Sequence, residues 1–114
     1  NFDEFSDFEI NKRVVGFLPL VIKDGVNSKL PSEVVVSDLI NEYAFDGCTN
    51  PSQAWPIIMD NKIDIEWFSE FGTATSKLCK GFEVIKFTNP EHALKAAMIV
   101  FLKINEEKQN ANTK

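Results

Sequence analysis

Residues 49–54 read Thr49-Asn50-Pro51-Ser52-Gln53-Ala54, and residues 88–93 repeat the phrase as Thr88-Asn89-Pro90-Glu91-His92-Ala93, each ahead of an apolar run. In both phrases Asn can cap a helix, and Pro takes the first helical position, where its missing N–H and fixed φ cost little. The repeat therefore predicts two helices. Because the stretch between them is typical of strands, the second half of the chain is expected to form helix, antiparallel strands and helix.

The strands between these helices are predicted from alternation and from glycine. Residues 63–67 alternate apolar and acidic side chains, as in a strand with one buried and one wet face. Residues 71–73 resemble a hairpin connection, residues 75–78 a partner strand, and Gly81 begins a further strand over 82–87. Three strands are therefore expected to meet here.

The helix that starts at Pro90 is expected to reach about Glu106 and to be the most buried helix. Its apolar face is wide, which leaves mainly Lys95 and Lys103 for solvent. The apolar set is Ala93, Leu94, Ala97, Met98, Val100, Phe101, Leu102 and Ile104. Residues 109–114 read as a disordered polar tail, so the predicted single domain spans residues 1–108.

An N-terminal helix is predicted over residues 7–15. Ser6 and Glu9 have the spacing of a capping box, in which the Ser6 hydroxyl accepts from the backbone N–H of Glu9. Gly16 is suited to the position after the last helical residue.

The segment from residue 17 to residue 46 carries weaker signals. Residues 20–23 and 33–36 are short pieces with β propensity between proline and glycine breakers. Beyond them, residues 37–43 could form a short helix capped by Ser37, or residues 43–45 could form an edge strand. Both alternatives stay open at this point.

The helix that begins at Asn50 should end near Asn61 and be disturbed by Pro56. This proline removes the hydrogen bond to the Ser52 carbonyl, so a kink or a broken first turn is expected. The predicted fold class is α+β, a small α/β sandwich in which two or three helices pack on an antiparallel sheet of about three to five strands.

The composition is that of one small globular domain. The chain has 114 residues, and ten Phe in so short a chain indicate an aromatic-rich core or an aromatic binding surface. Its formal charge of −5 argues against direct nucleic-acid binding and suits a basic protein partner, although it also simply favours solubility. With an acidic start and no long apolar run, we expect a soluble cytoplasmic protein without a membrane partner.

No catalytic or metal site is expected. His92 is the only histidine, and Cys48 and Cys79 have no local activating neighbour, so both are interpreted as reduced, buried thiols. Asp64 and Glu66 could pair for acid–base chemistry or bind a divalent cation, but any solvated strand face shows the same spacing. We therefore expect a protein that is not an enzyme and has no cofactor.

The two tryptophans are candidates for contact with another molecule. Trp55 lies on the predicted second helix, and Trp67 is expected on the acidic face of its strand unless Phe68 or a bulge changes the phase. An indole near a wet face can stack on a base or anchor a protein interface. Alternatively, both rings seal the edges of a small core.

Three blocks of the sequence resemble one family. They are residues 6–12, 48–58 and 96–102, at both ends and in the centre of the chain. These blocks look like the NinX-like proteins of tailed bacteriophages, within the wider phage ABA sandwich group. The resemblance implies a small α/β/α-type sandwich that is encoded among phage accessory genes and acts in the cytoplasm of an infected host bacterium. It implies no catalytic residue, and residues 16–46 depart from the family's pattern.

The first hypothesis is a non-enzymatic phage protein that binds a bacterial host protein and modulates or inhibits it, as an anti-defence inhibitor would. An interface needs only a few aromatic anchors and a charged rim. The predicted anchors are Trp67, Phe68 and Phe71, and the predicted rim is Asp64 and Glu66.

The second hypothesis is a sponge that sequesters a nucleotide immune signal between the subunits of a homo-oligomer. An indole would stack on the base, while lysines or capped helix starts would meet the phosphate. The predicted ligand-binding residues are Asn50, Trp55, Trp67, Lys77, Lys80 and Asn89.

Overall fold

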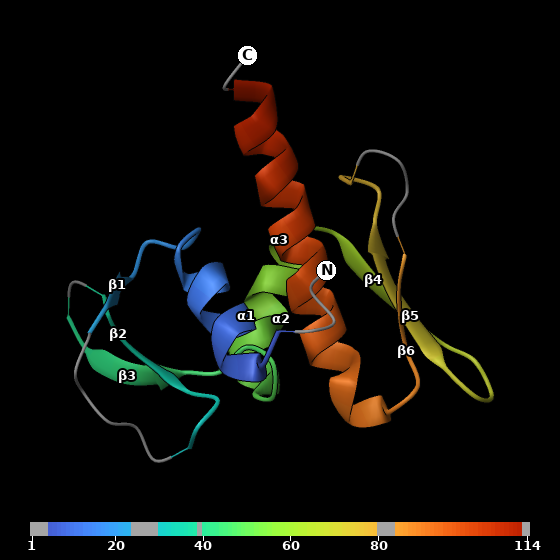
Figure 1. Cartoon of the computed structure of the whole chain (residues 1–114), viewed down its shortest axis with the longest axis horizontal. Helices are drawn as coiled ribbons and strands as arrows, with labels where there is room; N and C mark the ends of the chain where they lie inside the picture. Colours follow the sequence, from blue (N-terminus) through green and yellow to red (C-terminus); the bar gives the residue numbers. More distant parts are fainter. Residues whose placement is uncertain (1–4, 24–29, 39, 80–83, 113–114) are drawn as a thin grey trace.

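The computed structural model describes residues 5–23, 30–38, 40–79 and 84–112, with side chains up to residue 109. The elements follow one another as α1 (Asp7–Val15), β1 (Val21–Ile22), β2 (Val34–Ser37), β3 (Glu42–Phe45), α2 (Pro51–Asp60), β4 (Ile63–Trp67), β5 (Gly72–Ser76), β6 (Ile85–Phe87), the 3-10 turn η2 (Pro90–His92) and α3 (Ala93–Asn112). Within the described ranges, three α-helices and two three-stranded antiparallel sheets confirm the predicted α+β class (Figure 1).

Helix α3 stands between the two sheets (Figure 1). Sheet A consists of β1, β2 and β3 and lies with α1 on one side of α3, and sheet B consists of β4, β5 and β6 on the other. The helix packs against α1, α2 and all three strands of sheet B. Its buried residues are Ala93, Ala96, Ala97, Met98, Ile99, Val100, Phe101, Leu102 and Ile104. The prediction that the C-terminal helix is the most buried one is confirmed.

Two details of α3 differ from prediction. The helix ends at Asn112 and not near Glu106. Lys95 does not face open solvent: its side chain is only 19% exposed, and its ammonium lies 3.2 Å from the Asp7 carboxylate on α1. Lys103 is half-buried as well. Lys95 is covered because α1 packs beside α3 at its flank.

Both repeated phrases form caps as predicted, but the second caps the 3-10 turn η2, which leads into α3 at Ala93. The Asn50 side chain accepts from the Ser52 N–H at 3.0 Å, and the Asn89 side chain accepts from the Glu91 N–H at 2.9 Å. The first of these helices, α2, has an intact first turn and continues through Pro56, so the expected break is wrong. Because the ring of Pro56 and residue Ser52 are both exposed, water can reach the carbonyl that lost its partner.

In the N-terminal half, local sequence signals correctly predict helix α1 and one of the two alternatives for residues 37–45. Helix α1 spans the predicted residues, and the Ser6 hydroxyl accepts from the Glu9 N–H at 3.2 Å. Of the two alternatives for residues 37–45, the strand is correct: β3 pairs with β2 in the register Val34↔Phe45. The turn between them is closed by Asp38, whose carboxylate accepts from the backbone N–H groups of Asn41 and Ile40, and these bonds lower its pKa.

In sheet B, β4 has the predicted bounds, but the predicted hairpin connection at residues 71–73 is wrong. The connection is residues 68–71, closed by the Phe68 N–H donating to the Phe71 carbonyl at 2.8 Å, and the partner strand starts at Gly72. Gly72 pairs with both Trp67 and Phe87, and any Cβ here would collide with the Phe87 ring. The glycine is therefore needed inside the strand and not in the turn. Of the predicted last strand over 82–87, residues 82 and 83, and Gly81 before them, lie outside the described residues.

A buried polar network joins α1, sheet A and α2. The Asp46 carboxylate accepts from the Asn11 amide at 2.8 Å and from the hydroxyls of Ser32 and Thr49, each at 2.6 Å. The side-chain oxygen Oδ1 of Asn11 accepts in turn from the Cys48 backbone N–H at 3.1 Å. Asn11 and Asp46 are 0% and 4% exposed, so each needs these partners to offset its lost hydration.

Replacement of Asn11 by Ala should lower the free energy of unfolding by about 3 kcal/mol, because it leaves a buried carboxylate oxygen and a buried N–H short of a partner. Urea denaturation measures this loss. Asn41→Ala is the matched control at an exposed position and should cost about 0.5 kcal/mol or less. Equal stabilities of the two variants would contradict the structural role of the network.

Candidate functional site

One face of sheet B is packed on α3 and the other is open. The inner row contains Ile63, Ile65, Trp67, Gly72, Ala74, Ser76, Ile85 and Phe87, and the outer row contains Asp64, Glu66, Thr73, Thr75 and Lys86. In the outer row Asp64 lies opposite Thr75, and Thr73 lies between Glu66 and Lys86. We call this outer row the open face. It carries carboxylates along β4, threonines along β5 and a lysine on β6.

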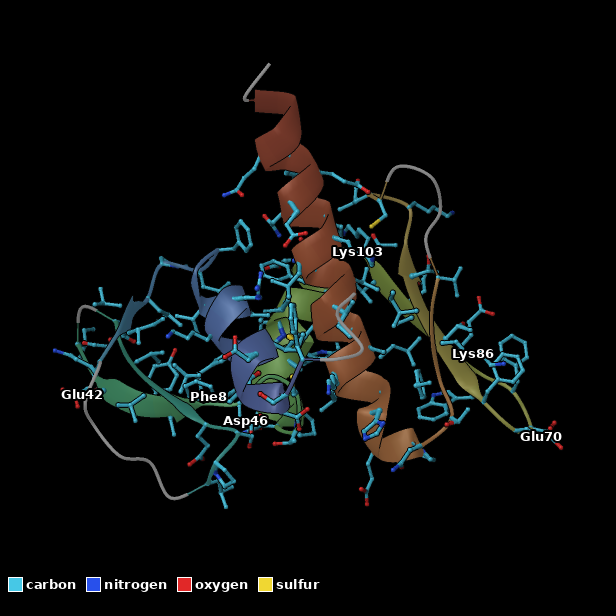
Figure 2. The ribbon with its side chains drawn as sticks, in the orientation of Figure 1. Phe8, Glu42, Asp46, Glu70, Lys86 and Lys103 are labelled. Atoms are coloured by element: carbon cyan, nitrogen blue, oxygen red, sulfur yellow. The ribbon has the colours of Figure 1, made fainter. Side chains whose placement is uncertain are left out.

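Two phenylalanines extend the open face at the hairpin end. Phe68 and Phe71 are stacked, with ring centroids 4.8 Å apart and an interplanar angle of 19°. The Lys86 ammonium lies 4.5 Å from the centre of the Phe71 ring, which is cation–π geometry. Phe68 remains 50% exposed. Glu70 lies at the far end of the same hairpin (Figure 2). The structure therefore brings two of the three predicted anchors together with the predicted acidic rim.

Trp67 is not on the acidic face, and that prediction is wrong. Strand alternation gives residue 67 the phase of Ile63 and Ile65, and the indole meets Phe87 edge to face at 5.3 Å. It is Phe68 that continues the phase of the acidic residues. With 60% of its surface exposed, Trp67 both seals the rim of the core over Phe87 and stays accessible beside the Phe68–Phe71 pair.

The hairpin end is too small to enclose a ligand. Its pocket measures about 100 Å³, whereas sites for drug-sized molecules measure about 300 to 1,000 Å³. The residues that line it include Trp67, Phe68, Phe71, Phe87 and Pro90. Its shape suits contact with another surface better than it suits enclosure of a nucleotide.

The residues predicted for a nucleotide site are only partly brought together. Trp55 and Lys77 line one groove of about 440 Å³, which Trp67 does not reach. The side-chain oxygens of Asn50 and Asn89 are used in capping their own helices. Lys80 lies outside the described residues.

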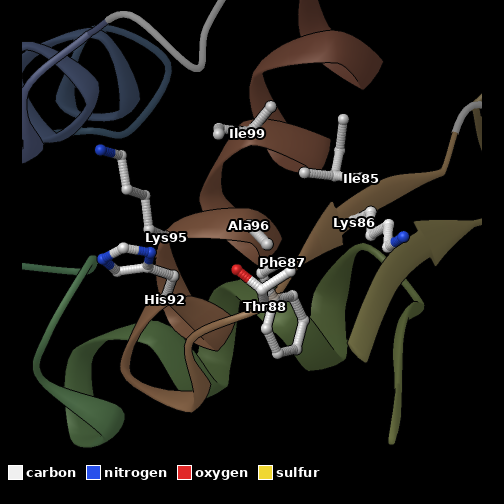
Figure 3. A pocket seen from close by; sticks show the side chains of 8 residues that line it. All are labelled: Ile85, Lys86, Phe87, Thr88, His92, Lys95, Ala96 and Ile99. Atoms are coloured by element: carbon white, nitrogen blue, oxygen red, sulfur yellow. The ribbon is translucent and has the colours of Figure 1, made fainter. Parts of the chain in front are cut away.

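A third depression lies between β6 and the start of α3 (Figure 3). It measures about 410 Å³, and its polar side chains include His92, Thr88 and Lys95. Figure 3 shows the imidazole of His92 beside the Lys95 side chain, while the Lys86 ammonium points away. Among the described lining residues there is no carboxylate or thiol beside His92, so the geometry does not assemble a base with an orienting acid.

Cys48 and Cys79 are buried, as predicted. Burial raises the pKa of the Cys48 thiol, and the nearby carboxylates of Asp7 and Asp46 raise it further. A raised pKa keeps the sulfur protonated, which removes the nucleophilic thiolate. Across the described residues no cluster of three metal-ligating side chains occurs.

Lys62 and Lys86 were not among the predicted site residues. Lys62 belongs to the turn before β4 and lines the groove with Trp55, and Lys86 reaches the open face through strand pairing. Alternation along residues 85–87 predicts the face on which Lys86 lies. Its neighbour across the sheet, Thr73, depends on the register between β5 and β6, which the sequence pattern does not give.

None of the helices in the described part of the chain combines the length and the apolar character that a membrane span requires.

Fold and surface together define a small α+β domain with one open, acidic and aromatic sheet face. The family described as Bacteriophage P22, NinX matches residues 1–104, so the chain belongs to this family and is a phage accessory protein. The resemblance seen in the sequence is confirmed. Comparison with curated proteins and with solved structures finds no match.

Iodoacetamide should leave both cysteines unmodified in the folded protein at pH 8, because neither thiol is exposed and that of Cys48 stays protonated. We expect modification to be at least about 100-fold slower than in urea, as measured by mass spectrometry. The unfolded chain is the internal control. Fast labelling of Cys48 under native conditions would contradict its burial and its raised pKa.

Proposed function

We propose that this phage protein binds a bacterial host protein through the open face of sheet B and modulates or inhibits it. The observation that carries the proposal is the stacked pair Phe68 and Phe71 at the end of a sheet face that α3 does not cover. Exposed aromatic rings next to charged residues are typical of the centre and rim of protein interfaces.

The charges of the open face indicate the kind of partner. Asp64 and Glu66 are exposed along β4, and Glu70 lies at the hairpin end, whereas Lys86 is placed over the Phe71 ring. A basic surface on the partner would complement the three carboxylates and would be attracted by the net charge of −5. The rings would then supply the apolar centre of the contact.

The arrangement supports inhibition in which the open face occupies a functional surface of the partner protein. A surface that works by contact needs no cofactor and no reactive group, and the host cytoplasm is where a phage accessory protein would meet host enzymes. We propose an anti-defence inhibitor as the specific role, in which the open face covers a basic functional surface of a host defence protein.

Phe68→Ala and Phe71→Ala should each weaken binding to the host partner by about 30-fold or more, which corresponds to about 2 kcal/mol for a central interface residue. The partner is first captured from host lysate with the wild-type chain, then purified and measured by biosensor. Phe8→Ala is the matched control, since Phe8 is an exposed ring on α1, on the other side of α3 (Figure 2). Unchanged affinity of both hairpin variants would remove the open face from the interface.

Neutralising the rim with Asp64→Asn and Glu66→Gln should slow association about tenfold and flatten its dependence on salt, with little change in dissociation. Stopped-flow mixing at low and at physiological ionic strength measures both rates. Glu42→Gln, on the exposed edge of sheet A, is the control for each single rim substitution, since it also removes one negative charge. An association rate that does not respond to the rim variants would contradict a basic partner.

A further inference from the structure

A second surface of the molecule combines an exposed indole with two lysines. The groove lies between α2 and the ends of β4 and β5, and it is lined by Trp55, Ile58, Met59, Lys62, Ile63, Asp64, Lys77 and Leu78. From this geometry we propose that the groove binds a mononucleotide, whose base stacks on Trp55 and whose phosphate is held by Lys62 and Lys77. The groove lies at the opposite end of β4 from the hairpin, and Asp64 borders both the groove and the open face.

The apolar part of the groove is open to solvent. Trp55 is 59% exposed, and Met59 and Leu78 are exposed beside it, while Ile58 and Ile63 form a buried floor. Single exposed apolar residues need no explanation, but three around one concave surface are typical of a binding site. An indole ring accepts a nucleobase by stacking, whatever the base, because every base has a π-face.

The charged part of the groove selects for an anion. Lys62 and Lys77 lie on it, and no carboxylate forms an ion pair with either one in the part of the chain that the structure describes. Ammonium groups beside an exposed indole match a ligand that joins a flat ring to a phosphate. A volume of about 440 Å³ falls within the range of small-molecule sites.

Hydrogen bonds hold the lysine-bearing turns in place before any ligand arrives. The buried Ser76 hydroxyl donates to the Asn61 carbonyl at 2.7 Å and accepts from the Leu78 N–H at 3.1 Å, which ties the turn after β5 to the turn after α2. Lys62 has a positive φ of 52°, a costly backbone for a residue with a side chain. A site that is ordered in advance loses less entropy on binding.

Asp64 is the acidic member of the groove. Its carboxylate repels phosphate at its own side, so the phosphate is directed toward the lysines, and it can accept hydrogen bonds from a base amino group or a ribose hydroxyl. The three polar side chains therefore impose one orientation: base over Trp55 and phosphate at Lys62 and Lys77.

Trp55 fluorescence tests the proposal directly. In the Trp67→Phe variant Trp55 is the only tryptophan, and titration with AMP, GMP, CMP and UMP should give saturable quenching with at least one of them. Lys62→Gln and Lys77→Gln should each raise the dissociation constant about tenfold, and the matching nucleoside without phosphate should bind about tenfold more weakly. Lys12→Gln, an exposed lysine on α1, is the control and should change nothing.

Two results would overturn the proposal. One is the absence of saturable quenching by all four nucleotides at millimolar concentration, checked by calorimetry on the unmodified chain. The other is quenching that neither lysine variant nor removal of the phosphate weakens, which would be unselective stacking on an exposed ring. The Phe68→Ala variant should bind the nucleotide normally, so failure at the groove and failure at the open face are told apart.

Discussion

Asp46 places a carboxylate in the interior where α1, sheet A and α2 meet, and an unpartnered charge there would be strongly destabilising. Its oxygens are satisfied by Asn11, Ser32 and Thr49, which come from three different segments. These contacts fix how the three segments meet, because a shift of any one of them would strip the carboxylate of a donor. The turn that follows Asp46 sets the direction of α2, and α2 in turn leads into β4 and the candidate sites.

Sheet B carries both candidate sites, and its packing depends on the close approach of the Gly72 backbone to the Phe87 ring. Gly72 lets Phe87 lie directly on β5, and Trp67 covers the edge of that ring from β4. With these rings on the inner side, Phe68 and Phe71 are left to the outer side, where they stack on each other. Strand alternation thus divides four neighbouring aromatic rings between two faces, and Gly72 makes the room for Phe87 on the inner one.

Features with local causes could be predicted from the sequence. The caps at Asn50 and Asn89 and the bounds of β4 depend on residues within a few positions of each other, and they are correct. The local pattern misses the hairpin at 68–71, because Gly72 is needed inside β5 for its contact with Phe87, fifteen residues further along the chain. The face of Trp67 is predicted wrongly, although strand alternation alone decides it. The position of Trp55 beside Lys62 depends on how α2 packs against sheet B, and no local sequence pattern predicts that packing.

Helix α3 follows every strand in the chain, yet it supplies the wall against which sheet B and α1 both pack. During synthesis the earlier segments therefore emerge from the ribosome with their apolar sides uncovered. Neither side can complete its interior until α3 has been translated, so folding of the whole domain is expected to be a single late event and not a stepwise one.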